Sequence, residues 1–291
     1  MTNNKSFTLI ELLVVIAIIG VLSAIIITSI SGAVTKSRIV RLQVFSDSIR
    51  AQLSDSLVSY WSFNEGTGVT AYDQWEGNNG TLGGGTPDYY PTWRSGGECV
   101  SGKCLEFDGS NDYVNCGNNE SLDISTNTTW SWWMKWNGNA GNYKGIISRG
   151  TVSNTYTIRI NGQDGTNNLQ FRYYGVQTLN SGITPSQDWE YWTILKTDRN
   201  FRFYKNGVYI TEDNAGQEIV NSGNLLIGYY EGYEYFSGLI DEVRIYNSAA
   251  SITQIQSQYL AGLDKLLSNG AISKSEYNQR IKELSKEIVI E

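Results

Sequence analysis

The chain of 291 residues contains no histidine, three cysteines and three prolines. Without histidine, the Ser-His-Asp and Cys-His catalytic arrangements are excluded within this chain, and so are most zinc sites. Acid–base catalysis would have to depend on carboxylates. Basic residues are also few, with 22 Lys and Arg against 29 Asp and Glu and a formal net charge of −7, and they are scattered. This balance argues against binding to nucleic-acid phosphates.

Charge is absent from a long run near the N-terminus. The 19 residues from Leu12 to Ile30 carry none, and as a helix they would extend about 28 Å, enough to cross the hydrocarbon core of a bilayer. A secretory signal peptide is the simpler interpretation, but its apolar region covers only about 7–15 residues. Glu11 lies at the start of the run, where a carboxylate in lipid is costly unless it is paired. The segment is therefore predicted to span a membrane, and Glu11 to have a partner.

The string SFTLIE, which begins at Ser6, followed by this apolar run, resembles the N-terminal methylation motif of type IV prepilins and pseudopilins. The resemblance implies that a prepilin peptidase cleaves between Ser6 and Phe7 on the cytoplasmic side, and that Phe7 is then methylated. It also implies that Glu11 pairs with the terminal amine of a neighbouring subunit. The family usually has glycine where Ser6 stands. Residues 1–6 are thus the expected leader and 7–56 the expected transmembrane and assembly helix.

This resemblance also implies a location and partners. The chain would cross the cytoplasmic membrane once, in contact with lipid, with its C-terminal part outside. It would then join other pilin or pseudopilin subunits in a surface or periplasmic filament. A membrane-anchored module that never polymerises is the alternative, because hydrophobicity and charge bias fit a plain signal anchor as well.

Cysteines outside the cytoplasm are permitted to form disulfides. Cys99 and Cys104 bracket four residues that read as a tight turn, and we predict a bridge between them. Cys116 follows an alternating run and is predicted to be a small buried side chain. Pairings that involve Cys116 stay open at this point.

Beyond residue 57 the hydrophobic period changes to two, which is typical of strands. Gly, Asn and Asp become dense between the short alternating runs, and Asn161-Gly162 and Asn206-Gly207 are turn signals. Many short strands without helical segments between them indicate an all-β sandwich. The clearest predicted strands cover residues 156–160, 169–173, 191–195, 201–204 and 239–246.

Four strings in this region resemble landmarks of the laminin-G-like, concanavalin A-like jelly-roll family. They are YWSFNEGTG from Tyr60, CLEFDGSNDYV from Cys104, FRFYKNGV from Phe201 and SGLIDEVRIYNSA from Ser237. The resemblance implies an antiparallel jelly-roll sandwich over residues 57–250, and it implies glycan binding as a function.

A structural calcium ion is often present in that family. Glu65, Asp73 and Asp241 carry the hard oxygen ligands that calcium prefers, and they are its expected ligands here. The alternative is that residues such as Asp73 only shape turns.

Aromatic residues fall into two groups. Those in strand-like runs are expected to fill the core, and they are Trp61, Trp130, Trp132, Trp133, Trp189 and Trp192. Aromatic residues in loop-like contexts are candidates for sugar contacts, and they are Trp75, Tyr89, Tyr90, Trp93, Tyr143, Tyr229, Tyr230, Tyr233 and Tyr235. Of these, we predict Trp75, Tyr230 and Tyr233 as ligand-binding residues. Packing or a subunit interface is the other interpretation of these loop rings.

An enzyme is the competing function for a concanavalin-like fold, since its glycoside hydrolases place two carboxylates on one strand face. The pattern Glu-x-Asp-x-x-Glu is absent. The nearest candidates, Asp241 and Glu242, are adjacent and are expected on opposite faces of a strand, with Arg244 at the third place. We therefore predict a binding module and no catalysis.

The C-terminal residues 251–291 return to a helical period. Two helices, at 254–267 and 274–288, flank an Asn-Gly turn, and Ser273 with Glu276 forms a capping box. The resulting hairpin is expected to pack or to self-associate. The whole sequence thus predicts a long N-terminal helix, a jelly-roll sandwich and a helical hairpin. The function predicted from it is a pilin-like or pseudopilin-like subunit that displays a domain for binding carbohydrate or a surface protein.

Overall fold

The structure is a computed structural model that describes Leu13 and residues 55–287, apart from 124–125, 139–140, 151–155, 174, 217–222, 231 and 233. The chain divides into two compact units, Met1–Ser48 and Ile49–Glu291. The predicted leader, the predicted helix over 7–56 and its residues Ser6, Phe7 and Glu11 lie outside the described residues. Within the described part, no helix is long and apolar enough to cross a membrane.

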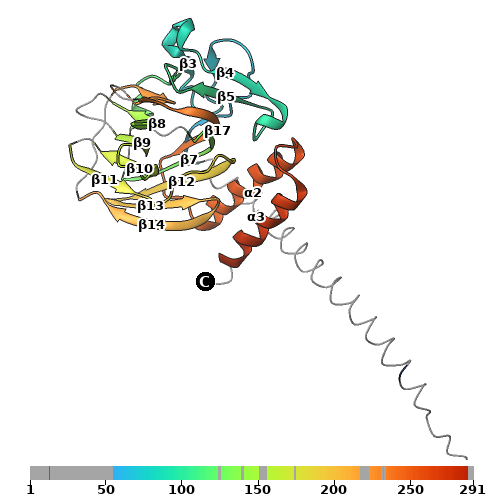
Figure 1. Ribbon diagram of the computed structural model, residues 1–291. Coiled ribbons are helices and arrows are strands. Elements are labelled where there is room, and N and C mark those ends of the chain that lie inside the picture. The colour runs from blue at the N-terminus through green and yellow to red at the C-terminus, as the bar shows by residue number, and fades with distance from the viewer. Residues whose placement is uncertain are drawn as a thin grey trace, which may run out of the picture. The chain divides into compact units, whose positions relative to one another are not determined.

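Two β-sheets stack face to face as a jelly-roll sandwich, which confirms the predicted fold class (Figure 1). Sheet 1 runs in the order β14 (Val208–Asn214), β13 (Asn200–Lys205), β12 (Glu190–Thr197), β7 (Asn127–Trp136), β17 (Ser237–Tyr246), β5 (Lys103–Asp108), β4 (Thr92–Ser95), with β1 (Leu57–Trp61) also paired to β17. Sheet 2 runs in the order β11 (Gln177–Asn180), β10 (Asn168–Tyr173), β9 (Tyr156–Asn161), β8 (Tyr143–Arg149), β15 (Leu225–Ile227), β6 (Val114–Asn115), β3 (Gly80–Leu82), β2 (Thr70–Ala71), with β16 (Glu234–Tyr235) parallel to β8. Short 3₁₀ helices lie in the connections, at η1 (Gly83–Gly85), η2 (Pro87–Tyr89), η3 (Gly96–Glu98) and η4 (Glu120–Leu122).

The predicted turn at Asn206-Gly207 joins β13 to β14. Lys205 pairs with Val208 across it, and the backbone φ angles of Asn206 and Gly207 are 53° and 77°. Positive φ at both central residues is the requirement of the two-residue hairpin turn that matches strand twist. The turn therefore fixes the register of the hairpin.

The core lies between the two sheets and is rich in aromatic rings. All six tryptophans that were predicted to fill the core are buried, at most 3% exposed. Trp61, Trp130, Trp132 and Trp192 lie in this core, whereas Trp133 and Trp189 are buried outside it. Cys116 is buried in the same core, as predicted, and burial raises the pKa of its thiol. Cys99 and Cys104 form the predicted disulfide, with their Cα atoms 5.4 Å apart.

The C-terminal hairpin of α2 (Ile252–Ser268) and α3 (Lys274–Glu287) covers the outer face of sheet 1 (Figure 1). Trp133 points outward from β7, and its ring stacks on Tyr259 of α2 at 5.7 Å between centroids. Gly262 allows this close approach, because a Cβ atom there would lie 2.5 Å from the Trp133 indole. The predicted cap is present, with the Glu276 amide donating to Ser273 Oγ at 3.1 Å. A capping box with both of its bonds, between Ser251 and Gln254, begins α2.

Strand β17 contains a bulge that corrects one prediction. The register with β7 shifts between Asp241 and Arg244, and Glu242 has a φ of 55°. Such a bulge adds one residue to the strand and changes the alternation of its faces. Ile240 and Val243 both enter the core. Asp241 and Glu242 therefore lie together on the outer face of sheet 1, so their predicted placement on opposite faces was wrong.

Candidate functional site

Four tyrosines form one row of rings at the surface, which we call the four-tyrosine surface. Tyr229 and Tyr235 stack with ring centroids 4.2 Å apart, Tyr113 follows at 5.7 Å from Tyr229, and Tyr89 at 6.3 Å from Tyr113. Tyr89 is 39% exposed and the other three are half-buried. The rings come from η2, the segment before β6, the loop after β15 and strand β16. Four separate segments thus build one aromatic surface.

Oxygen-bearing side chains lie beside these rings. Asn111 Nδ2 donates to the Asp88 carbonyl oxygen at 2.8 Å, and the Asp108 amide donates to Asp112 Oδ2 at 2.9 Å. Burial, with smaller effects from neighbouring carboxylates, raises the pKa of Asp112 to about 6. Asp88 and Asp108 are exposed. Flat rings beside amide and carboxylate oxygens suit a ligand that has both an apolar face and hydroxyl groups.

The three residues predicted to bind a ligand differ in how exposed they are in the structure. Trp75 is 49% exposed, as a contact residue requires. Tyr230 is 1% exposed, so the expectation that its ring is available to a ligand was wrong. The backbone of Tyr230 passes close to Gly145, where a Cβ atom on residue 145 would lie 2.5 Å from the Tyr230 nitrogen. Because glycine has no side chain, Tyr230 can occupy this buried position. Tyr233 lies outside the described residues.

Asp73 organises a turn. Its carboxylate accepts backbone N–H bonds from Tyr60 at 2.8 Å, Asn78 at 2.9 Å and Trp75 at 3.1 Å, with a fourth from Glu76 at 3.2 Å. Asp73 thus shapes a turn, which was the alternative to calcium binding in the sequence analysis. The turn also fixes the backbone that carries the exposed Trp75 ring.

The structure does not bring the three predicted calcium ligands together. Glu65 accepts a bond from the Tyr72 amide at 3.0 Å, and Asp241 accepts bonds from two amides of the disulfide loop. Among the described residues, no group of three or more Asp, Glu or Cys side chains is placed to hold a metal ion. Glu65, Asp73 and Asp241 therefore do not form one calcium site, and a structural calcium ion elsewhere in the domain stays a prediction.

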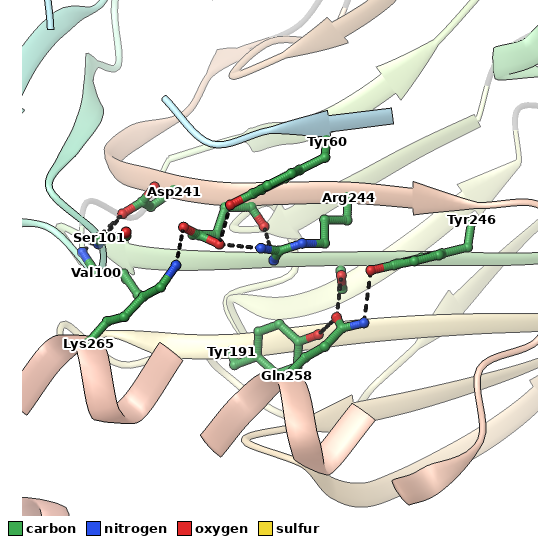
Figure 2. Close-up of polar contacts among 11 residues, drawn as sticks. Tyr60, Val100, Ser101, Tyr191, Asp241, Arg244, Tyr246, Gln258 and Lys265 are labelled. Atoms are coloured by element: carbon green, nitrogen blue, oxygen red, sulfur yellow. Dashed lines mark hydrogen bonds and ion pairs between the residues drawn. The ribbon is translucent and has the colours of Figure 1, made fainter. Parts of the chain in front are cut away.

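A network of polar groups lies between sheet 1 and α2 (Figure 2). Glu242 is at its centre, in contact with Tyr60, Arg244 and Lys265. Glu242 Oε1 is 2.9 Å from Lys265 Nζ, and Oε2 accepts from the Tyr60 hydroxyl at 2.9 Å and from Arg244 Nη2. Burial raises the pKa of Glu242, but the charges of Arg244 and Lys265 outweigh burial and hold it at about 2. Glu242 is therefore ionised at neutral pH. The Arg244 guanidinium also lies over the Tyr60 ring, 4.0 Å from its centroid.

The adjacent carboxyl group has the opposite character. Asp241 is fully buried, and Oδ2 accepts from the amides of Val100 and Ser101 at 3.0 Å each. Oδ1 has no hydrogen-bond partner in the described part of the chain. Burial, reinforced by the charge of Glu242, raises the pKa of Asp241 well above its ordinary value. The pKa values of the two neighbouring carboxyl groups are thus shifted in opposite directions.

Gln258 of α2 continues the network along the sheet (Figure 2). Its Oε1 accepts from the hydroxyls of Tyr191 at 2.5 Å and Ser131 at 3.3 Å, and its Nε2 donates to the Tyr246 hydroxyl at 2.8 Å. A buried amide costs free energy unless such bonds are made. These bonds fix how α2 is seated on the sheet.

A groove of about 530 Å³ opens between this network and α2, within the volume range of small-molecule sites. We call it the α2 groove. It is lined by Leu57, Tyr60, Gln74, Trp75, Trp133, Glu242, Arg244, Tyr246, Gln258, Ala261, Gly262 and Lys265.

Comparison with protein families decides the classification. A family model described as the concanavalin A-like lectin/glucanases superfamily matches residues 108–256, more than half of the chain. The chain belongs to this superfamily. Residues 1–27 match a second model, the prokaryotic N-terminal methylation motif. Both resemblances seen in the sequence are thereby confirmed.

Solved structures of this lectin-like fold include binding domains. Domain 4 of AbnA, an extracellular GH43 arabinanase from Geobacillus stearothermophilus, was solved with arabinotriose and is similar over 69% of this chain and 97% of its own, with a TM-score of 0.57 and 18% identity. The ligand-binding domain of botulinum neurotoxin serotype D, solved with N-acetylneuraminic acid, has a TM-score of 0.54 and 16% identity over 73% of this chain and 52% of its own. The binding domain of Paraclostridial Mosquitocidal Protein 1 has a TM-score of 0.52 and 16% identity over 73% of this chain and 53% of its own. The chain spans about half the length of the two toxin domains, and at these identities the similarity concerns the fold.

The superfamily also includes glucanases. In this member the adjacent pair Asp241 and Glu242 is 0% and 3% exposed. Glu242 is held by two cations and a hydroxyl, and Asp241 by two amides. Neither carboxyl group of this pair is available to a sugar polymer.

Sequence reasoning missed two parts of the site. Tyr113 was treated only as part of a strand-like run, although its ring joins the four-tyrosine surface. The α2 groove was missed because it depends on the bulge at Glu242 and on the seat of α2. A signal was present in Gly262, a glycine inside an otherwise regular helical pattern, since such a glycine often marks a close contact.

Proposed function

We propose that the chain is a pilin-like or pseudopilin-like filament subunit whose lectin-like domain binds carbohydrate at the four-tyrosine surface. The observation that carries the proposal is one chain with both an N-terminal methylation motif and a lectin-like sandwich that presents a row of tyrosine rings. In this proposal the N-terminal segment anchors and assembles the subunit, and the sandwich is displayed outside the cell or in the periplasm.

The chemistry of the four-tyrosine surface supports carbohydrate as the ligand. The partly exposed rings pack on the apolar faces of sugars, while Asn111 and Asp88 beside them offer bonds to hydroxyl groups. Two proteins with the same fold were solved with arabinotriose and with N-acetylneuraminic acid. A surface protein as the ligand is the second candidate, since tyrosine is also enriched in protein interfaces.

The methylation motif supports the assembly role. It implies a prepilin peptidase as a processing partner, cleavage before Phe7 and insertion in the cytoplasmic membrane. Glu11 would then hold the terminal amine of a neighbouring pilin or pseudopilin subunit. No nucleic-acid partner is expected, because the chain is acidic.

Binding is tested with the full chain in detergent on an array of neutral and acidic glycans. Tyr229→Ala removes the central ring and should weaken binding of any positive glycan by about tenfold or more. Tyr209→Ala is the matched control, because Tyr209 is 49% exposed on β14 and outside the four-tyrosine surface. An array without any signal, or equal losses in the two variants, would contradict carbohydrate binding at this surface.

Assembly is tested by co-expression with a cognate prepilin peptidase and assembly proteins. The mature N-terminus should be methylated Phe7, and any other mature N-terminus rejects the pilin interpretation. Glu11→Ala should stay in the membrane but fail to enter filaments. Unchanged behaviour of Glu11→Ala in cells that make filaments would support the alternative, a membrane-anchored module that does not polymerise.

A structural calcium ion is a separate proposal for the same domain. Bound calcium would stabilise the folded state by mass action. The melting temperature should then fall when EDTA is added and recover with calcium. An unchanged melting temperature would remove calcium from the proposal without affecting carbohydrate binding.

A further inference from the structure

The α2 groove combines an exposed flat ring with an excess of positive charge. Trp75 is 49% exposed at this groove, and its amide is held by Asp73 Oδ1 at 3.1 Å. The ring is thus presented on an ordered turn. It offers a platform for the apolar face of a ligand.

The charged side chains that line the groove are Arg244, Lys265 and Glu242. The single carboxylate already engages both cations, through Oε1 with Lys265 and Oε2 with Arg244. Its two oxygens are therefore occupied, and a further cation finds no free carboxylate among the lining residues. Two cations against one anion leave the lining with one net positive charge, although the whole chain carries −7.

Lys265 is the group best placed to reach a ligand. Its side chain is 39% exposed, and its bond to Glu242 uses one of the three N–H groups of an ammonium. The side chain of Arg244 is 17% exposed beside it. A carboxylate entering the groove would meet charge-assisted donors, which form the stronger class of hydrogen bonds.

We propose that the α2 groove is a second binding site, for a carboxylate-bearing sugar unit of the uronic acid type. Trp75 contacts the face of the sugar ring, and Lys265, supported by Arg244, binds the carboxylate. The volume of about 530 Å³ suits a ligand of one or two sugar units. Of the large apolar side chains that line the groove, the Trp75 indole is the exposed one. A single exposed flat ring favours a sugar ring over the hydrophobic stripe of a peptide helix. The site shares no residue with the four-tyrosine surface.

The test uses the full chain in detergent and calorimetric titration with tri-galacturonic acid, with neutral galactotriose as the comparison. Lys265→Met keeps the aliphatic stem but removes the charge, and it should weaken tri-galacturonate binding by about tenfold. Trp75→Ala should weaken it by a similar factor of about tenfold. Galactotriose should bind about tenfold more weakly than the acidic trimer to the unaltered protein.

Matched variants separate this proposal from the others. Lys282→Met removes an exposed charge from α3 and should leave the affinity within about twofold. Tyr229→Ala should leave tri-galacturonate binding unchanged, so failure of the four-tyrosine surface is distinguishable from failure of the groove. Melting temperatures show whether Lys265→Met affects folding. Trp75→Ala changes an exposed side chain and should leave the core intact.

Three outcomes would overturn the proposal. They are no binding of tri-galacturonate, equal affinity for the acidic and neutral trimers, and unchanged affinity in Trp75→Ala. A glutamate-rich peptide of the same charge that binds as tightly as the trimer would reassign the groove to acidic peptides and reject the sugar.

Discussion

Lys265 of α2 lies 2.9 Å from Glu242 of β17, so the helical hairpin is tied by charge to the central strand of sheet 1. The Lys265 side chain is 39% exposed and that of Glu242 is 4% exposed. An ion pair between a solvated cation and a buried anion is asymmetric, because removing one partner has a different cost from removing the other. Each variant is compared with the wild type as the full chain in a mild detergent.

Glu242→Gln should destabilise the domain by about 3 kcal/mol, because Arg244 would lose its counter-charge while its side chain stays largely buried. Glu212→Gln is the matched control, since its pair with Arg202 is half exposed on both sides and is worth at most about 1 kcal/mol. Denaturant unfolding followed by tryptophan fluorescence measures both. If both variants lose the same free energy of unfolding, the Glu242 network contributes no more to stability than a surface ion pair.

Asp241→Asn should raise the melting temperature at pH 8 and leave it nearly unchanged at pH 4. The pKa of Asp241 is raised in the folded chain, so its contribution to stability is present below its ordinary value of 3.8 and is lost as the pH rises. Asparagine carries no proton to lose, and it keeps an oxygen for the Val100 and Ser101 amides. A lower melting temperature for the variant at pH 8 would contradict the raised pKa.

The contribution of Glu242 to stability should depend on pH in the opposite sense to that of Asp241. Its folded pKa of about 2 lies below the ordinary 4.5, so its contribution to stability is present above about pH 4.5 and is lost as the pH falls toward 2. The stability difference between wild type and Glu242→Gln should therefore shrink between pH 5 and pH 2, as thermal unfolding over that range would measure. A constant difference would contradict the assignment.

Gly262→Ala should destabilise the domain by about 1–2 kcal/mol, although alanine favours a helix over glycine by about 1 kcal/mol. The new Cβ atom would lie 2.5 Å from the Trp133 indole, so α2 would have to move. Thr253→Ala in the first turn of α2 is the control for helix propensity alone. A rise in melting temperature for Gly262→Ala would show that the hairpin has room to shift without cost.

Replacing both Cys99 and Cys104 with serine should cost about 2 kcal/mol, the entropy expected for so short a loop. Thermal unfolding with and without dithiothreitol measures the effect. Reductant should lower the melting temperature of the wild type toward that of the double variant and leave the variant unchanged. A variant as stable as the wild type would show that the hydrogen bonds of the loop hold it without the bridge.

The sandwich, the hairpin and most strands could be predicted because they depend on local patterns. Alternation indicated the strands, and Asn206-Gly207 indicated a turn that needs two positive φ angles. Four of the six strand tryptophans fill the core, as their apolar area predicts. The four-tyrosine surface was only partly predictable. Its rings come from four segments that the chain order does not place together, so Tyr113 was overlooked.

The bulge at Glu242 and the burial of Tyr230 depend on tertiary contacts, which produce no periodic pattern in the sequence. The positive φ of Glu242 is unusual for a residue other than glycine, and the alternating pattern gives no sign of it. Tyr230 looked like a loop aromatic, yet the missing side chain of Gly145 lets it become buried. The burial of this ring thus depends on a close backbone contact with a distant segment of the chain, which local sequence does not indicate.

The pairing of β1 with β17 joins the two ends of the sandwich, with Ser59 opposite Ile245. Strand β17 is the last to be synthesised, yet it lies between β7 on one side and β5 and β1 on the other. Sheet 1 therefore stays in separate pieces until β17 has paired with these neighbours. Contacts between such distant segments make folding slow. Before that pairing, the edges of β7, β5 and β1 that face β17 have no strand partner. A chaperone that shields these edges would act before β17 is in place.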